Sequence, residues 1–166
     1  MAYLIAIPLL GALILVQMAV LSRAPLLHGT PDLMLLVVAA WAIRPRVRSQ
    51  IFWTILGIFF VGYTSALGYL VPAIAYGITV LVATALRRRV WRALLLAYLL
   101  VVLIGSMSFH ALTVLFLFVQ GASLPLAEIV NQIVLPSLVL NLSLALPVYV
   151  LVGDLADRLY PEELDI

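Results

Sequence analysis

Few side chains in this sequence are of a type that can do chemistry. The chain has 166 residues, of which 66% are hydrophobic and 10% are charged. Among the polar side chains within or beside its long apolar stretches are Gln17, Asp32, His110 and Asn141. A polar group among apolar ones requires a hydrogen-bond partner, so these residues either tie helices together or line a recess. We expect the four to converge on one recess, named here the candidate outer pocket.

Two of these residues are ionisable, and each has a structural and a functional interpretation. His110 is either a buried neutral histidine bonded to a neighbour or a group that contacts a ligand or handles protons. Thr30-Pro31-Asp32 predicts the start of a helix, because threonine can cap, proline suits the first turn and aspartate there meets the positive end of the helix dipole. The start of a helix is enough to explain this motif, and Asp32 also remains a candidate for the outer pocket.

The sequence lacks the residues that several classes of enzyme and transporter require. There is no cysteine, and the two histidines are far apart in the sequence, which argues against a metal site or an iron–sulfur cluster. We find no H-E-x-x-H motif, no Gly-rich phosphate loop and no paired carboxylates. The charged relays that mark pumps are missing from the interior of the apolar stretches. We therefore expect neither an enzyme nor an active transporter, and no cofactor.

The elements that must position these residues are transmembrane helices, because the composition is that of an integral membrane protein. The hydrophobic pattern predicts one all-α domain with six spans, over residues 3–21, 32–44, 51–69, 72–86, 93–119 and 137–153. The second span has 11 apolar residues, Leu33 to Ile43, or about 17 Å against a hydrocarbon core of about 30 Å. Either the Arg44 side chain extends it by snorkelling, or the loop before it dips into the membrane and lines a recess.

Two further segments lie outside these spans. Apolar residues recur at helical spacing over 126–134 opposite Glu128, Asn131 and Gln132, which predicts a short amphipathic helix at the outer interface, ended by Pro136. Residues 154–166 form an acidic tail.

The arginines indicate the orientation of the chain. Seven flank the apolar stretches in two clusters: Arg44, Arg46, Arg48, Arg87, Arg88, Arg89 and Arg92. Such clusters are retained in the cytoplasm, so both termini are expected inside, in a multi-pass membrane protein. The other interpretation, a patch for nucleic acid or a partner, is disfavoured between apolar spans, and we expect no nucleic-acid partner. The three tryptophans fall at the same boundary and suggest an aromatic belt there.

Small residues recur in the third and fourth spans: Gly57, Gly62, Ala66, Ala73 and Gly77. Small side chains let helix backbones approach closely where lipid supplies no hydrophobic drive. Two interpretations remain open, since these residues either close the two helices into a hairpin or form a groove for a partner's transmembrane helix. If the groove is elsewhere, the amphipathic helix over 126–134 is the next surface to consider.

Several short features follow one another along the chain: Gln17, Pro31-Asp32-Leu33, Gly57 with Gly62, Leu67-Gly68, and Asn141 with Pro147. Their order resembles that of the rod shape-determining protein MreD family of bacteria, which implies a protein of the bacterial cytoplasmic membrane. The chain departs from the family in one place, because Thr64-Ser65 stand where an acidic residue usually follows the second glycine. Any role that depends on that carboxylate is in doubt.

The resemblance implies a non-catalytic scaffold of the elongation complex that builds the lateral cell wall. Its partners would be an MreC-like bitopic membrane protein and, with it, RodA, a penicillin-binding transpeptidase and the MreB filament. The family is also similar in fold to the S-components of vitamin uptake systems, six-helix bundles with an outward-facing pocket. The alternative is therefore a substrate-binding membrane subunit for a small molecule or vitamin.

Overall fold

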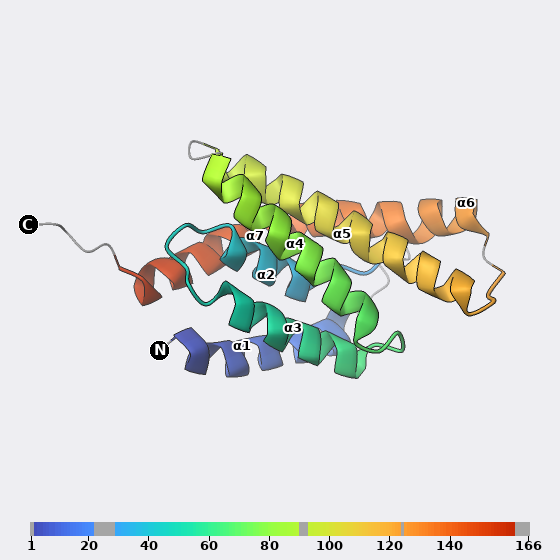
Figure 1. Ribbon diagram of the computed structural model, residues 1–166, viewed down its shortest axis with the longest axis horizontal. Helices are drawn as coiled ribbons and strands as arrows, with labels where there is room; N and C mark the ends of the chain where they lie inside the picture. The colour runs from blue at the N-terminus through green and yellow to red at the C-terminus, as the bar shows by residue number, and fades with distance from the viewer. Residues whose placement is uncertain (1, 22–28, 90–92, 124, 162–166) are drawn as a thin grey trace, which may run out of the picture.

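The computed structural model describes residues 2–21, 29–89, 93–123 and 125–161. Over these ranges the chain forms a helical bundle without strands (Figure 1). In chain order the helices are α1 (Ala2–Val16), the π-helical turn η1 (Gln17–Leu21), α2 (Leu33–Ala42), α3 (Gln50–Thr64), α4 (Leu70–Arg89), α5 (Leu94–Val119), α6 (Leu126–Ile129), the π-helical segment η2 (Val130–Val134) and α7 (Leu135–Leu159).

Within the described residues, four stretches are long and apolar enough to cross a membrane by length and composition. They are Ala2–Ala19, α4, α5 and the continuous stretch Leu126–Leu159. A bundle with several helices of this kind is that of a membrane-embedded protein. The stretches predicted as spans at 32–44 and 51–69 form the shorter helices α2 and α3, so helix length supports four of the six predicted spans.

The end of α3 is set by a turn that comes earlier than the hydrophobic pattern predicts. Ser65 is already extended, with φ −88° and ψ 135°. Gly68 follows with a φ of +65°, in the left-handed region where a side chain would be strained. Pro72 then falls in the first turn of α4, where its missing N–H leaves no helical bond unmade. The turn between α3 and α4 is thus longer than predicted.

The short helix α2 lies at the centre of the bundle. It contacts α1, α3, α4, α5 and α7, and every residue from Met34 to Ile43 is buried. A helix that is apolar all round is buried in lipid or in protein, and here other helices enclose it. Just before this helix, Gly29 and Pro31 are also buried, whereas Thr30 between them is exposed. Both alternatives for this helix, extension by Arg44 and a loop that dips into the membrane, stay predictions.

The helices alternate in direction, so their ends gather into two sets (Figure 1). At one, on the left of the view, α1 and α3 begin and α2, α4 and α7 end. This end holds Arg44, Arg46 and Arg48 after α2, and Arg87–Arg89 in the last turn of α4, and we call it the arginine end. The other, where α5 meets α6, is the outer end. Arg92 lies outside the described residues.

The predicted amphipathic helix and the predicted last span form one continuous helix. Pro136 does not end the first of them, because the backbone passes through η2, where the Leu135 N–H bonds to the carbonyl of Val130, five residues earlier. The π-helical bonding pattern leaves room for a proline just beyond it. The helix then runs to Leu159, six residues past the predicted boundary at 153, so the acidic tail begins on α7. The 34 residues of this stretch correspond to a length of about 51 Å.

The tryptophans at the arginine end do not form a lipid-facing belt. Trp41 and Trp53 are fully buried and stack on each other with ring centroids 4.0 Å apart. The indole N–H of Trp41 donates to Ser49 Oγ at 3.1 Å, and the Tyr160 hydroxyl donates to the same oxygen at 3.0 Å. Because the indole N–H of Trp41 has a hydrogen-bond partner inside the protein, this side chain does not need to lie at the membrane–water interface. Trp91 lies outside the described residues.

Candidate functional site

The first turn of α2 is the focus of the polar groups in the described structure. Asp32 caps this helix, and its Oδ1 accepts a hydrogen bond from the backbone N–H of Leu35 at 3.0 Å. The hydroxyl of Tyr76 on α4 donates to both carboxyl oxygens, at 3.0 Å each. An aspartate at this position satisfies a helix N–H that has no partner within the helix. The carboxyl group thus joins α2 to α4.

Asn141 on α7 extends this cluster across the bundle. Its Oδ1 accepts from the backbone N–H of Asp32 at 2.8 Å, and its Nδ2 donates to Ser106 Oγ on α5 at 2.9 Å. Asn141 and Ser106 are both buried, so each hydrogen bond replaces one that water would otherwise make. One amide therefore connects three helices.

The chain that enters α2 is held by two more side chains. Gln17 Oε1 in η1 accepts from the backbone N–H of Met34 at 3.4 Å. Ser137 Oγ on α7 accepts from the N–H of Thr30 at 3.1 Å. At Gly29, a Cβ would lie 2.6 Å from the backbone nitrogen of Ser137, so glycine is needed for this close approach. The entry of the chain into the bundle is therefore specified by contacts with η1 and α7.

A small cavity lies among these groups, and all four candidates for the outer pocket line it. Its volume is about 100 Å³, and its walls are formed by Gln17, Thr30, Pro31, Asp32, Leu35, Val61, Ser106, Phe109, His110 and Asn141. At a liquid volume of about 30 Å³ per water, it has room for a few water molecules. Ligand pockets are typically about 300–1,000 Å³. The structure brings the four residues together around a space of solvent size.

Tyr76 is the member of this cluster that sequence reasoning missed. It is fully buried and is the tyrosine whose hydroxyl reaches Asp32. A signal existed, because a tyrosine in mid-helix among aliphatic residues needs a partner for its hydroxyl. Tyr98 on α5 is a parallel case, since its hydroxyl donates to the Leu36 carbonyl at 3.2 Å. Neither partner could be named without the tertiary arrangement.

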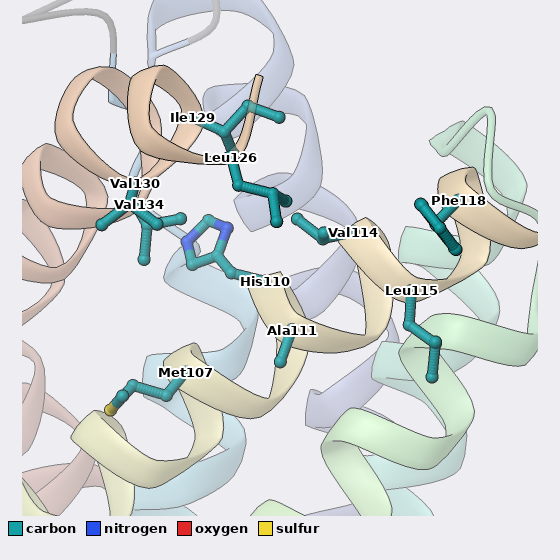
Figure 2. A pocket seen from close by; sticks show the side chains of 10 residues that line it. All are labelled: Met107, His110, Ala111, Val114, Leu115, Phe118, Leu126, Ile129, Val130 and Val134. Carbon is teal, nitrogen blue, oxygen red and sulfur yellow. The ribbon is translucent and has the colours of Figure 1, made fainter. Parts of the chain in front are cut away.

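A larger space opens on the other side of His110. It is an apolar groove of about 560 Å³ between α5 and the helix formed by α6 and η2, and we call it the outer groove. It is lined by Met107, His110, Ala111, Val114, Leu115, Phe118, Leu126, Ile129, Val130 and Val134. Figure 2 shows the imidazole ring of His110 between α5 and the side chains of Leu126, Val130 and Val134. Histidine is the one polar side chain in this wall.

His110 separates the two spaces, because it lines both the small cavity and the outer groove. The interaction recorded for its ring among the described residues is an edge-on contact with Phe109, with centroids 6.1 Å apart. A histidine nitrogen in an apolar wall has no neighbour there to form a hydrogen bond. A molecule that binds in the groove can supply one. His110 and Asp32 both line the small cavity, and the Asp32 carboxyl group there is already bonded to Leu35 and Tyr76.

The small-residue candidates do not share one surface. Gly57 and Gly62 are buried, and a Cβ on Gly62 would clash with the ring of Tyr69, while one on Gly57 would lie 3.2 Å from Val38 Cγ2. Gly77 is exposed, and a Cβ there would have nothing within 4 Å. Ala73 is half-buried, and Ala66 is exposed in the turn after α3. The first two close the bundle internally, so these five residues do not form a single groove.

The candidate arginines divide into inward and outward groups. Arg44 Nη2 donates to the carbonyl of Tyr149 at 3.1 Å, and Arg87 Nη1 donates to the carbonyls of Ala42 and Arg44 at 3.4 Å each. Arg87 thus places its charge at the negative C-terminal end of α2. The others in the described chain are exposed: Arg46, Arg48, Arg88 and Arg89.

Comparison with protein-family models, with curated proteins and with solved structures finds no match to this chain.

Proposed function

We propose that this chain is a non-catalytic membrane scaffold of the bacterial elongation complex. Six helices cross the cytoplasmic membrane with both termini in the cytoplasm. The outer groove receives the transmembrane helix of an MreC-like bitopic protein. Through that partner the chain supports RodA, the penicillin-binding transpeptidase and MreB in lateral cell-wall synthesis. The family resemblance motivates this assignment, and the outer groove is the observation in the structure that supports it.

The shape and lining of the outer groove favour a helix as its occupant. Two helical walls leave room for a third helix to contact both of them, and Ala111 on the α5 wall permits close approach. Lipid provides no hydrophobic drive for helix association, so such contacts depend on packing and on hydrogen bonds between helices. His110 supplies one hydrogen-bonding group within an otherwise apolar surface. A partner helix that carries a polar residue opposite His110 would form a hydrogen bond with the imidazole ring.

The alternative, an S-component-like subunit that binds a small molecule, receives less support from the polar cavity. Its volume of about 100 Å³ is below the range for ligand pockets. The polar atoms of Asp32 and Asn141 already bond to Tyr76, Leu35 and Ser106. Binding a vitamin there would require these bonds to break, and the free energy of the new contacts would have to exceed that of the old ones.

The test of the partner site is a substitution that fills the groove. Ala111 is exposed and lines it, so Ala111→Phe should obstruct a docked helix. Overpacking a helix contact costs about 1–3 kcal/mol, and recovery of the MreC-like partner on affinity purification should therefore fall about tenfold.

The matched control is Ala85→Phe, the same change at an exposed position on α4 that lines none of the cavities described here. Both variants should accumulate in the membrane at the level of the unmodified chain, and the control should retain the partner. Full partner recovery with Ala111→Phe would place the partner on another surface.

A further inference from the structure

The arginine end contains a third cavity that the scaffold role does not use. Its volume is about 290 Å³, and it lies between the turn after α2, the start of α5 and the end of α7. Arg44 and Arg46 line it together with Leu94, Tyr149, Asp157 and Tyr160. We call it the arginine-end cavity. It combines charged, aromatic and aliphatic walls, unlike the outer groove.

Arg44 is the central charge of this cavity and is incompletely paired. Its side chain is 17% exposed, and its guanidinium carbon lies 4.9 Å from the centroid of the Tyr149 ring. The ion pair with Asp157 is long, at 4.0 Å, and Asp157 is 67% exposed. Nε of Arg44 is buried without a hydrogen-bond partner among the described residues. A guanidinium has five N–H donors, and a largely buried one is stable when anionic groups satisfy them.

The surrounding charges give this site an excess of positive charge. Among the described residues that line the cavity, the guanidinium groups of Arg44 and Arg46 stand against one carboxylate, that of Asp157, and Arg87 reaches the Arg44 carbonyl. Tyr160 adds a hydroxyl at the rim, although it donates to Ser49. A single exposed carboxylate leaves the site suited to an anion.

Leucine side chains in and beside the cavity indicate that the ligand also has an apolar part. Leu94 begins α5 at the edge of the cavity, and the next residues, Leu95 and Leu96, are 37% and 67% exposed. These leucines extend an apolar surface from the cavity along the outside of the bundle. A ligand with a phosphate in the cavity and a hydrocarbon chain on these leucines would match both parts. Basic pockets between transmembrane helices on the cytoplasmic side bind the headgroups of anionic lipids in this way.

We propose that the arginine-end cavity binds the phosphate headgroup of an anionic phospholipid, with Arg44 and Arg46 on the phosphate and the first turn of α5 beneath the acyl chain. This site is separate from the outer groove. It places a specific lipid against both the end of α2 and the end of α7.

The proposal can be tested by native mass spectrometry of the purified chain with phosphatidylglycerol or phosphatidylcholine of identical acyl chains. Phosphatidylglycerol should remain bound preferentially. Arg46→Gln should weaken its binding about fivefold, the contribution of one arginine near an anionic headgroup, and Arg44→Gln at least as much. The matched control is Arg89→Gln, which removes the same charge from an exposed position of the arginine end that does not line the cavity.

Each contrary outcome has a definite meaning. Equal weakening by Arg46→Gln and Arg89→Gln would show a diffuse basic face and overturn the site. Full displacement of the lipid by millimolar inorganic phosphate would identify a free anion as the ligand and overturn the lipid assignment. Arg46 is exposed, so its variant keeps the test valid even if Arg44→Gln does not fold.

Discussion

At the scale of single residues, the structure separates groups that hold the bundle together from groups available to a ligand. Asp32 and Asn141 belong to the first class, because their side chains bond to α2, α4 and α5. His110 and Arg44 belong to the second, since each lines a cavity with hydrogen-bonding capacity to spare. Residue type alone does not distinguish the two classes. The difference is whether neighbouring helices supply hydrogen-bond partners for the side chain.

The bond between Tyr76 and Asp32 makes a prediction about stability. Tyr76→Phe removes the hydroxyl that donates to both carboxyl oxygens without leaving a cavity. Hydrogen bonds between membrane helices contribute about 0.6–2 kcal/mol, so the free energy of unfolding should fall by an amount in that range. Thermal unfolding in detergent would measure it.

The matched control for this measurement is Tyr63→Phe. Tyr63 is 77% exposed on α3, and surface changes of this kind lie within about 0.5 kcal/mol. If the two variants unfold at the same temperature, the hydroxyl of Tyr76 does not stabilise the carboxyl group as the geometry indicates.

At the scale of elements, we predict opposite effects on folding when Gly62 and Gly77 of the candidate hairpin are replaced by leucine. Gly62→Leu would drive a side chain into the ring of Tyr69, whereas Gly77→Leu meets open space. The first variant should lose folded, monodisperse protein on size-exclusion chromatography, and the second should elute as the unmodified chain does. A well-folded Gly62→Leu protein would mean that the contact with Tyr69 is easily relieved.

Helix positions were largely predictable from the sequence, and helix environments were not. The start of α2 carries a local signal in Thr30-Pro31-Asp32, although the cap is Asp32 and not Thr30 as predicted, and Pro31 precedes the helix. Helix α5 begins and ends within one residue of its predicted limits. The central place of α2 has no such signal, because the same apolar residues suit burial in lipid or in protein. For the same reason, the stacking of Trp41 on Trp53 could not be distinguished from an interfacial belt.

The candidate site was predictable to a similar extent. The requirement that buried polar groups find partners predicted the grouping of Gln17, Asp32, His110 and Asn141 around one space. The role of Tyr76 and the close approach of Gly105 to Thr79, where a Cβ would lie 2.5 Å from Thr79 Oγ1, depend on how α4 meets α2 and α5. Such contacts between distant segments are not encoded in local spacing.

At the scale of the whole molecule, the orientation is the property to test first. The alternating helices and the collection of arginines at one end predict that reporter fusions after Arg48, Arg92 and Ile166 all report the cytoplasm. A fusion within the segment 120–123, which connects α5 to α6, should report the opposite side and serves as the internal control. A periplasmic signal from the fusion at Ile166 would overturn the six-span arrangement, with α2 or α3 no longer counted as a crossing.

The continuous helix from Leu126 to Leu159 has a mechanical consequence. Its first two turns form one wall of the outer groove, and Tyr149, Asp157 and Tyr160 near its other end line the arginine-end cavity. One helix therefore contributes residues to both sites, and a tilt or rotation of the whole helix would alter both. If filling the groove moves this helix, lipid affinity at the far end changes by the same factor as partner affinity changes when lipid binds, since coupling between two binding sites is reciprocal.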